Sequence, residues 1–397
     1  GYAVNTVVLG DSGITAGTQT PEGGRIDRDD AGRPLGVIFD SACDLLTGPD
    51  GVKVGNHGPN FHLPMSDDEV ARLFGLGQRS FLAAGVTTIC DAQVTELEMA
   101  AYLRARDEGR LQLRAHLLYL SSKLEQLRGL GIVSRLGDER LELHGVKFYA
   151  DGSVIARTAY LGDHACCGSP SPEGYLYHEP EELHALIATA HALGLRTATH
   201  AQGEKPIEIV LGAVEAARER LPRKGLRHRI EHCGFPREDQ IERMGRLEVV
   251  PVPQPTQVHQ YADSLIEEYG DYGARFYPYG SFERHGLPVV ISSDAPVTSP
   301  APLYAAWVAT TRTTAGGATA GGQEQRATRS AALRGVGRAP ADLLERPDLG
   351  ALTPDSRADL VLLDSDPVTA DESALRSVAV TETWVGGEPV WAQEGIA

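Results

Sequence analysis

The sequence contains no run of apolar residues long enough to cross a bilayer. Its start, residues 1–5, has no basic region followed by an apolar core, so no signal peptide is visible. Basic residues are in deficit, because 37 Lys and Arg stand against 54 Asp and Glu, which gives a net charge of -17 and a pI near 5.2. Phosphate binding needs basic patches, so this balance argues against nucleic acid as a partner.

Cysteine is also scarce, and the positions of the five cysteines match neither a zinc finger nor a disulfide framework. We interpret the adjacent pair Cys166-Cys167 as reduced thiols of a loop or of the core. A reducing, cytoplasmic compartment is therefore expected. The expected partner is a small-molecule substrate, and no association with a membrane is expected.

Strands alternate with helices over most of the 397 residues, a length that suits one large α/β domain with a small appendage. The predicted helices span 66–84, 95–108, 179–193, 206–220, 236–245 and 279–285. The seven predicted strands lie at 85–91, 111–118, within 145–153, and at 195–200, 227–232, 247–252 and 287–294. This alternation predicts a parallel sheet of βαβ units and, with one more strand before Gly85, a (β/α)8 TIM barrel.

The first strand of such a barrel is missing from this count. Leu35–Phe39 is a candidate, but the turn residues around it make it a poor one. We predict an irregular N-terminal segment over residues 1–66, the barrel over 67–345, and a small C-terminal β element of one strand and a hairpin over 346–397. A barrel without its first strand has an open seam, and because exposed strand edges invite pairing, a homo-oligomer is a further expectation.

Lys147 stands in the middle of an apolar strand, Gly-Val-Lys-Phe-Tyr, that is closed by an Asp-Gly turn. Burying this lysine is costly because its ammonium loses its water. One interpretation lets the long stem of Lys147 reach the end of the sheet and pair with an acid. The other makes Lys147 an active-site group with a perturbed pKa, carboxylated on its amine to become an anionic metal ligand.

Polar residues end several of the predicted strands, and the carboxyl ends of barrel strands form the active site of such folds. These residues are Asp91, Lys147, His200, His232 and Asp294. Each of them alone is compatible with a structural role. The last four, however, fall on strands four, five, six and eight of one sheet. A divalent metal such as zinc suits their side chains, which are two imidazoles, a carboxylate and a lysine that could be carboxylated.

The same residues, in their order along the chain, resemble the amidohydrolase superfamily. The motifs that carry the likeness are Lys147 in Gly-Val-Lys-Phe-Tyr-Ala-Asp-Gly-Ser, His200 in Thr-His-Ala-Gln-Gly-Glu, His232 in Arg-Ile-Glu-His-Cys and Asp294 in Ser-Ser-Asp-Ala-Pro-Val. Residues 21–26 and the tail 350–361 extend the likeness over nearly the whole chain. Within the superfamily the sequence is similar to the family 3 amidohydrolases of the YtcJ type, relatives of N-substituted formamide deformylase.

This resemblance implies a metal-dependent hydrolase that cleaves a C–N bond, amide or formamide-like, of a small molecule. By the family pattern Lys147 would be the carboxylated bridging ligand, and His200 and His232 would bind a second metal, so that one or two zinc ions are expected. Asp294 would ligate metal and take the proton from the attacking water. Arg157 is a candidate for substrate binding, although pairing at the surface explains it equally well.

One feature of the family pattern is missing, because no His-x-His pair occurs in the sequence. The family places this pair at the end of the first barrel strand, and His57 and His62, five residues apart in a predicted loop, are poor substitutes. The chain also opens without an initiator methionine, so we expect an upstream segment to carry the pair. We expect the present chain to hydrolyse model amides poorly and a longer one to hydrolyse them with added zinc.

Two other functions stay open on the sequence. A degenerate, non-catalytic barrel would bind a small ligand or partner without metal chemistry. A barrel that keeps the metal could instead perform deamination, lactone hydrolysis or decarboxylation, since fold does not fix function. The sequence does not define the substrate, because specificity depends on irregular loops such as 160–178 and 253–280.

Overall fold

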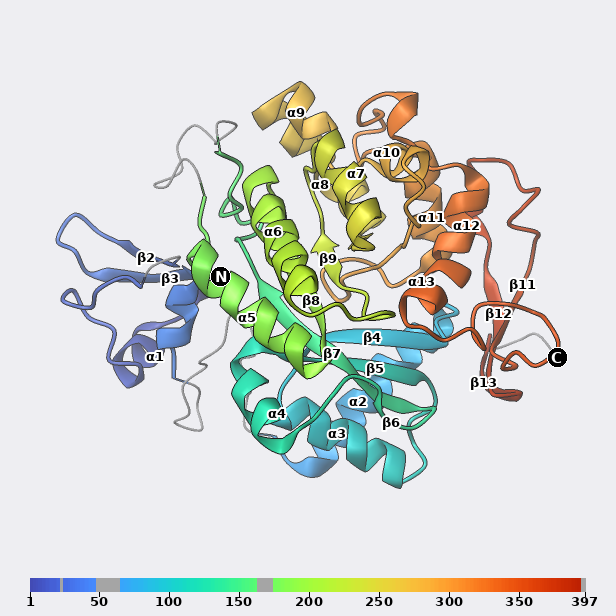
Figure 1. Cartoon of the computed structure of the whole chain (residues 1–397), viewed down its shortest axis with the longest axis horizontal. Helices are drawn as coiled ribbons and strands as arrows, with labels where there is room; N and C mark the ends of the chain where they lie inside the picture. Colours follow the sequence, from blue (N-terminus) through green and yellow to red (C-terminus); the bar gives the residue numbers. More distant parts are fainter. Residues whose placement is uncertain (22–23, 48–64, 163–173, 394–397) are drawn as a thin grey trace.

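A computed structural model describes residues 1–21, 24–47, 65–162 and 174–393 of the chain (Figure 1). Its main sheet has the strand order β10-β9-β8-β7-β5-β4, all parallel, with the short β6 antiparallel to β7. The strands are β4 (Thr88–Val94), β5 (Arg114–Leu120), β6 (Leu136–Gly137), β7 (Leu141–Tyr149), β8 (Arg196–Ala201), β9 (Arg229–His232) and β10 (Val250–Val252). Figure 1 shows the sheet curling from β4, which lies across the view, to β8 and β9, which stand upright. The predicted α/β barrel class is therefore confirmed, as a curled parallel half-barrel.

Helices cover the outer face of this sheet (Figure 1). From residue 67 onward the helices are, in chain order, α2 (Asp67–Ala83), α3 (Glu96–Asp107), α4 (Leu124–Leu130), α5 (Pro180–Leu193), α6 (Glu204–Arg220), α7 (Glu238–Leu247), α8 (Pro255–Tyr269), α9 (Asp271–Ala274), α10 (Tyr279–Arg284), α11 (Pro302–Thr311), α12 (Arg329–Gly335) and α13 (Arg338–Leu343). Ser66 and Glu69 form the predicted capping box of α2, and α5 ends at Gly194, whose φ of 79° is the left-handed conformation that glycine adopts at no steric cost. Among the described residues, no helix is both long enough and apolar enough to span a membrane.

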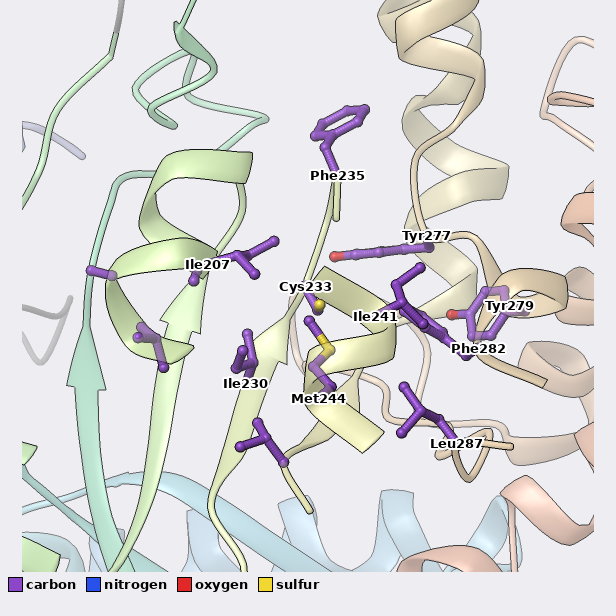
Figure 2. Close-up of a cluster of buried hydrophobic side chains, with 14 of the residues drawn as sticks. Ile207, Ile230, Cys233, Phe235, Ile241, Met244, Tyr277, Tyr279, Phe282 and Leu287 are labelled. Carbon is purple, nitrogen blue, oxygen red and sulfur yellow. The ribbon is translucent and has the colours of Figure 1, made fainter. Parts of the chain in front are cut away.

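A hydrophobic core fills the space between β8, β9 and the helices α6, α7 and α10 (Figure 2). Ile230 of β9 packs there with Ile207 of α6, Met244 of α7 and Phe282 of α10, and all four side chains are fully buried. Burying each such side chain contributes about 1.5–3 kcal/mol. Because Cys233 belongs to the same core, the packing also fixes the end of β9, where His232 lies.

The last predicted strand is wrong, because residues 287–294, all of them described, do not form a strand. The segment runs beside β10 but shares few bonds with its neighbours: the Ser292 N–H donates to the Pro253 carbonyl at 3.1 Å, and the Ile291 N–H donates to the Gly335 carbonyl at 3.0 Å. Pro288 has no N–H, and the N–H of Val290 is turned back onto the Pro288 carbonyl at 3.1 Å. Neither Pro288 nor Val290 can therefore donate a backbone hydrogen bond to β10, so a regular ladder between the two segments cannot begin here.

The candidate for the missing first strand is also wrong, because Leu35–Phe39 lies in β3 of a separate antiparallel sheet with the order β1-β3-β2. These elements are β1 (Tyr2–Ala3), α1 (Thr6–Asp11), β2 (Gly24–Arg28) and β3 (Pro34–Asp40). The turn residues that suggested an irregular segment over 1–66 instead close a hairpin, in which the Asp29 carboxylate accepts the N–H groups of Ala31 and Arg33. The domain boundaries at residues 66 and 345 stay predictions.

The C-terminal β element has the predicted strand followed by a hairpin. Its strands are β11 (Leu360–Leu363), β12 (Val380–Val385) and β13 (Glu388–Ala392), antiparallel in the order β11-β12-β13. Gly386 and Gly387 form the turn of the hairpin with φ values of 67° and 85°, which a two-residue hairpin turn requires. The sheet packs on α2, where the Thr383 hydroxyl donates to the Leu82 carbonyl at 2.7 Å.

A buried ion pair joins this C-terminal sheet to the barrel. Nε and Nη2 of Arg114 donate to the carboxylate oxygens of Asp359, at 2.7 and 3.0 Å. The Arg114 and Asp359 side chains are almost fully buried. The Gly386 N–H donates to the same carboxylate at 2.8 Å. Asp359 therefore connects the start of β5 to the turn of the C-terminal hairpin.

We predict that Asp359→Ala lowers the free energy of unfolding by about 3–5 kcal/mol, because it leaves the Arg114 charge buried without a partner. Denaturant unfolding at pH 7 measures this loss. The matched control is Glu139→Ala, which removes the half-exposed partner of Arg357 and should cost less than about 1 kcal/mol. Equal losses in the two variants would contradict the role given to Asp359.

Candidate active site

A cavity of about 540 Å³ extends from the inner side of the curled sheet to α13 and the first strand of the C-terminal sheet. One wall follows β4 and the residues before it, from Gly85 to Ala92, and the facing wall is the extended segment 290–295. Lys147, His232 and Asp294 line this cavity. His200 is not among its lining residues, but its ring centroid lies 4.4 Å from that of His232.

The four predicted ligands therefore lie at one end of the sheet. In the parallel ladders, Tyr149 of β7 is opposite His200 of β8, and Ala201 is opposite His232 of β9. His232 and Asp294 both have a positive φ, 68° and 55°, which is uncommon for residues other than glycine and is concentrated at functional sites.

Lys147 is 3% exposed, and the described residues give its ammonium neither a hydrogen bond nor an ion pair. Its nitrogen lies 4.8 Å from the centre of the Tyr149 ring. Burial lowers the pKa of Lys147 to about 8, although the carboxylates of Glu231 and Asp294 oppose this shift. Near pH 8 about half of this lysine is therefore a neutral amine, the form that can react with carbon dioxide.

The His200 ring has a fixed tautomer. Its Nε2 lies 2.8 Å from the carbonyl oxygen of Gly152, in the predicted Asp-Gly turn. A carbonyl can only accept, so Nε2 carries the proton and Nδ1 keeps its lone pair. Burial lowers the pKa of His200 well below its usual range, which keeps the ring neutral.

The His232 ring is oriented by Gln254. Its Nδ1 lies 2.7 Å from Oε1 of Gln254, and the amide orientation is set because Nε2 of Gln254 donates to the Val252 carbonyl at 2.7 Å. Nδ1 therefore donates, and Nε2 keeps its lone pair. Burial lowers the pKa of His232 to about 3. Both histidines thus show the arrangement usual for metal ligands, in which one ring nitrogen donates to a protein oxygen and the other is free to bind.

Within the described residues, only one carboxylate oxygen of Asp294 makes a hydrogen bond. Its Oδ2 accepts a hydrogen bond from Nε2 of Gln257 at 3.0 Å, and the Tyr277 hydroxyl lies 2.8 Å from the other end of that amide. Burial raises the pKa of Asp294 to about 6; the nearby Lys147 opposes this shift, and Glu231 adds to it. The carboxyl group can therefore exist in either protonation state near neutral pH.

The predicted ligands do not form a closed shell. In the described part of the chain, only His116, Glu142 and His144 form a group of three His, Cys, Asp or Glu side chains whose ligand atoms all lie within 4.8 Å of one another. His232 and Asp294 line the cavity and His200 packs against His232, but the three side chains do not meet that condition. Their ligand atoms would have to come closer together to share an ion.

Several cavity residues were not singled out by the sequence analysis. Arg229 and Glu231 form a fully buried pair inside the sheet, with Nη2 of Arg229 2.9 Å from Oε2 of Glu231, and Nη1 of Arg229 lies 3.4 Å from Sγ of Cys90. The period of two in Arg-Ile-Glu-His was the available signal, since it places both charges on the same face of β9. Asp91, which the sequence did mark, lines the cavity and accepts from the Tyr102 hydroxyl at 2.9 Å.

Arg157 lies outside the cavity lining, with its side chain 63% exposed and its Nε 3.5 Å from the carboxylate of Glu268. This contact corresponds to the surface-pairing interpretation, and substrate binding by Arg157 stays a prediction. His57 and His62 lie outside the described residues, as does the Cys166-Cys167 pair.

Comparison with known proteins gives matches over almost the whole chain. The model of the amidohydrolase family matches residues 2–391. N-substituted formamide deformylase of Arthrobacter pascens is 28% identical over 396 residues, which are 98% of this chain and 70% of that protein. The putative amidohydrolase YtcJ of Bacillus subtilis is 25% identical over 398 residues, 98% of this chain and 72% of that protein.

Solved structures show the same fold. An uncharacterized metal-dependent hydrolase from Pyrococcus horikoshii superposes with a TM-score of 0.71 at 24% identity, over 93% of this chain and 70% of that one. Because the family model extends from the first strand of the N-terminal sheet to the last strand of the C-terminal one, the chain belongs to the amidohydrolase family.

Proposed function

We propose that the protein is a metal-dependent hydrolase that cleaves a C–N bond of a small amide or formamide with water. The observation that carries the proposal is the pair of buried, neutral imidazoles of His200 and His232, which lie next to Lys147 and Asp294. Each imidazole uses one ring nitrogen to donate a hydrogen bond to a protein oxygen. Membership of the amidohydrolase family supports hydrolysis. The likeness to N-substituted formamide deformylase supports an amide or formamide bond as the one cleaved.

Lys147, His200, His232 and Asp294 are the residues proposed to hold the metal. Imidazole and carboxylate donors suit zinc. A mutant atrazine chlorohydrolase from Arthrobacter aurescens, which shares the fold with a TM-score of 0.55 at 17% identity, was solved in complex with zinc and atraton. A bound divalent metal supplies a water of lowered pKa and polarises the scissile carbonyl.

Lys147 is proposed to act as its N6-carboxylate. Carbon dioxide adds to a neutral amine, and burial makes that form of Lys147 accessible near pH 8. Carbon dioxide adds to the neutral amine of Lys147 with release of a proton, which gives an anion with two oxygen donors. A divalent ion bound between this anion and the two imidazoles would balance its buried charge.

Asp294 is proposed to move the proton during hydrolysis. Gln257 holds its Oδ2, and the described residues make no hydrogen bond to Oδ1, so this oxygen is available to take a proton from water. The same carboxyl group then gives the proton to the leaving nitrogen, and the products are a carboxylate and an amine. A pKa near 6 suits both transfers at neutral pH.

The cavity volume of about 540 Å³ is within the range of small-molecule sites, which supports a small-molecule substrate. The reduced thiols of Cys90 and Cys233 are consistent with the cytoplasm as the proposed compartment. Self-association stays a proposal drawn from the open edges of the sheet.

A second candidate is a barrel that binds a small ligand without catalysis. It is favoured by one observation, that His200, His232 and Asp294 do not bring their ligand atoms within 4.8 Å of one another. The assays below separate the two candidates.

We predict that Asp294→Asn lowers the turnover of zinc-loaded protein on N-alkyl formamides by about 100-fold or more, because the proton carrier is lost. Formate release measures the rate, and lactones and aminopurines tested in parallel report the alternative reactions. The control Asp364→Asn, which changes an exposed carboxylate beside the C-terminal sheet, should leave turnover unchanged. If a zinc-loaded protein that carries the His-x-His pair of the family pattern hydrolyses none of these compounds but binds them, the non-catalytic candidate replaces the first.

We also predict a carbamate on Lys147. With ¹³C-labelled bicarbonate and zinc at pH 8, a carbamate resonance should appear in the ¹³C NMR spectrum of the parent protein and be absent from Lys147→Met. Lys123→Met is the matched control, because Lys123 pairs with Glu96 at the surface and should not carry the signal. A resonance that survives in Lys147→Met would show that the carbamate lies elsewhere.

A further inference from the structure

We propose that His116, Glu142 and His144 form a second metal site, separate from the cavity, that takes a divalent ion of the zinc class. The three side chains come from neighbouring strands, His116 from β5 and the other two from β7. They are 1%, 6% and 0% exposed. None of them lines the cavity described above.

The distances within this cluster fit ligands of a shared ion better than hydrogen bonds. Nδ1 of His116 and Nδ1 of His144 each lie 3.5 Å from the same oxygen, Oε1 of Glu142. A charge-assisted hydrogen bond between such groups would be about 2.7–2.9 Å long. With metal–ligand bonds of about 2.0–2.2 Å, the ligand atoms of a tetrahedral zinc ion are about 3.3–3.6 Å apart.

The polar atoms of the cluster also lack partners. Nδ1 of His116, Oε1 of Glu142 and both ring nitrogens of His144 are buried and make no hydrogen bond within the described part of the chain. Buried polar atoms are nearly always bonded, so several unpaired ones that face one another point to a missing group. One cation at their centre would satisfy three of them at once.

The backbone of β7 is built to bring these side chains together. Glu142 is directly opposite His116 in the parallel ladder. The pairing then runs from Leu117 opposite Leu143 to Leu118 opposite Gly145, so His144 is an extra residue in the strand. Such a bulge redirects a side chain, here toward Glu142 and His116.

The charges around the cluster leave it able to accept a cation. Two arginines near His144 are each neutralised by a carboxylate of their own, Arg196 by Glu345 and Arg229 by Glu231. Burial lowers the pKa of His144 to about 3, which gives the neutral ring that binds metal. Arg135 reaches the other oxygen of Glu142 at 4.0 Å, and because its side chain is 47% exposed, its displacement would open a path from solvent.

This site would act on structure rather than on substrate. His144 precedes Lys147 by three residues, about 10 Å along β7, so the two sites occupy opposite halves of the strand. An ion bound here would cross-link β5 to β7 below the cavity and leave a fourth position for water. The inference does not depend on the proposed function.

Zinc stoichiometry of the full chain, measured after chelation and reloading with two equivalents, tests the proposal. We expect His116→Gln combined with His144→Gln to lose one equivalent, and His200→Asn combined with His232→Asn to keep it. The matched control is His191→Gln combined with His228→Gln, which alters two buried histidines that are hydrogen-bonded to each other and should lose none. Equal zinc content in the first double variant and the parent would overturn the proposal.

Anomalous diffraction at the zinc edge gives a second reading that needs no variant. In crystals of the parent chain grown with zinc, we expect a peak enclosed by His116, Glu142 and His144. A peak only at Lys147, His200, His232 and Asp294 would support the proposed function and overturn the second site. A peak only in the His-Glu-His cluster would support the second site and count against the first.

Discussion

The burial of ionisable side chains inside the half-barrel is the constraint on which the rest of the structure depends. Each charged side chain there must find a partner or become neutral, because an unpaired buried charge is costly. Arg114 is paired with Asp359, and Arg229 is paired with Glu231. The histidines follow the other route, since burial keeps His200, His232 and His144 neutral. Lys147 makes no ion pair with the described residues, and burial lowers its pKa although the carboxylates of Glu231 and Asp294 oppose this shift.

β7 concentrates the chemistry of the molecule. Its first half carries Glu142 and His144, and its second half carries Lys147. The bulge at His144 separates the two halves, so that the side chains before and after it meet different neighbours. Below the bulge the partner is His116 of β5, and above it the strand faces Ala198 and His200 of β8. One strand thus contributes to both the cavity and the buried His-Glu-His cluster.

Part of the candidate site could be predicted because it depends on short patterns. Lys147, His200 and His232 lie near the ends of apolar strands, and parallel strands bring such ends together. Asp294 lines the same cavity as Lys147 and His232, although the strand predicted for it does not form. The His116–Glu142 contact could not be predicted, since the register of β5 against β7 is not encoded in either strand alone. The His-x-His pair expected from the family pattern stays a prediction.

The sequence by itself determined the local elements. The capping box at Ser66, the glycine stop at Gly194 and the Gly386-Gly387 hairpin were all readable, because each involves residues within a few positions of one another. The tertiary structure alone decided that residues 287–294 stay out of the ladder, that Leu35–Phe39 joins a separate sheet, and that Arg114 meets Asp359 across the fold. It also lowers the pKa of Lys147 and raises that of Asp294. The physical reason is that desolvation and pairing depend on every group that surrounds a side chain in space, and most of those groups are distant in the sequence.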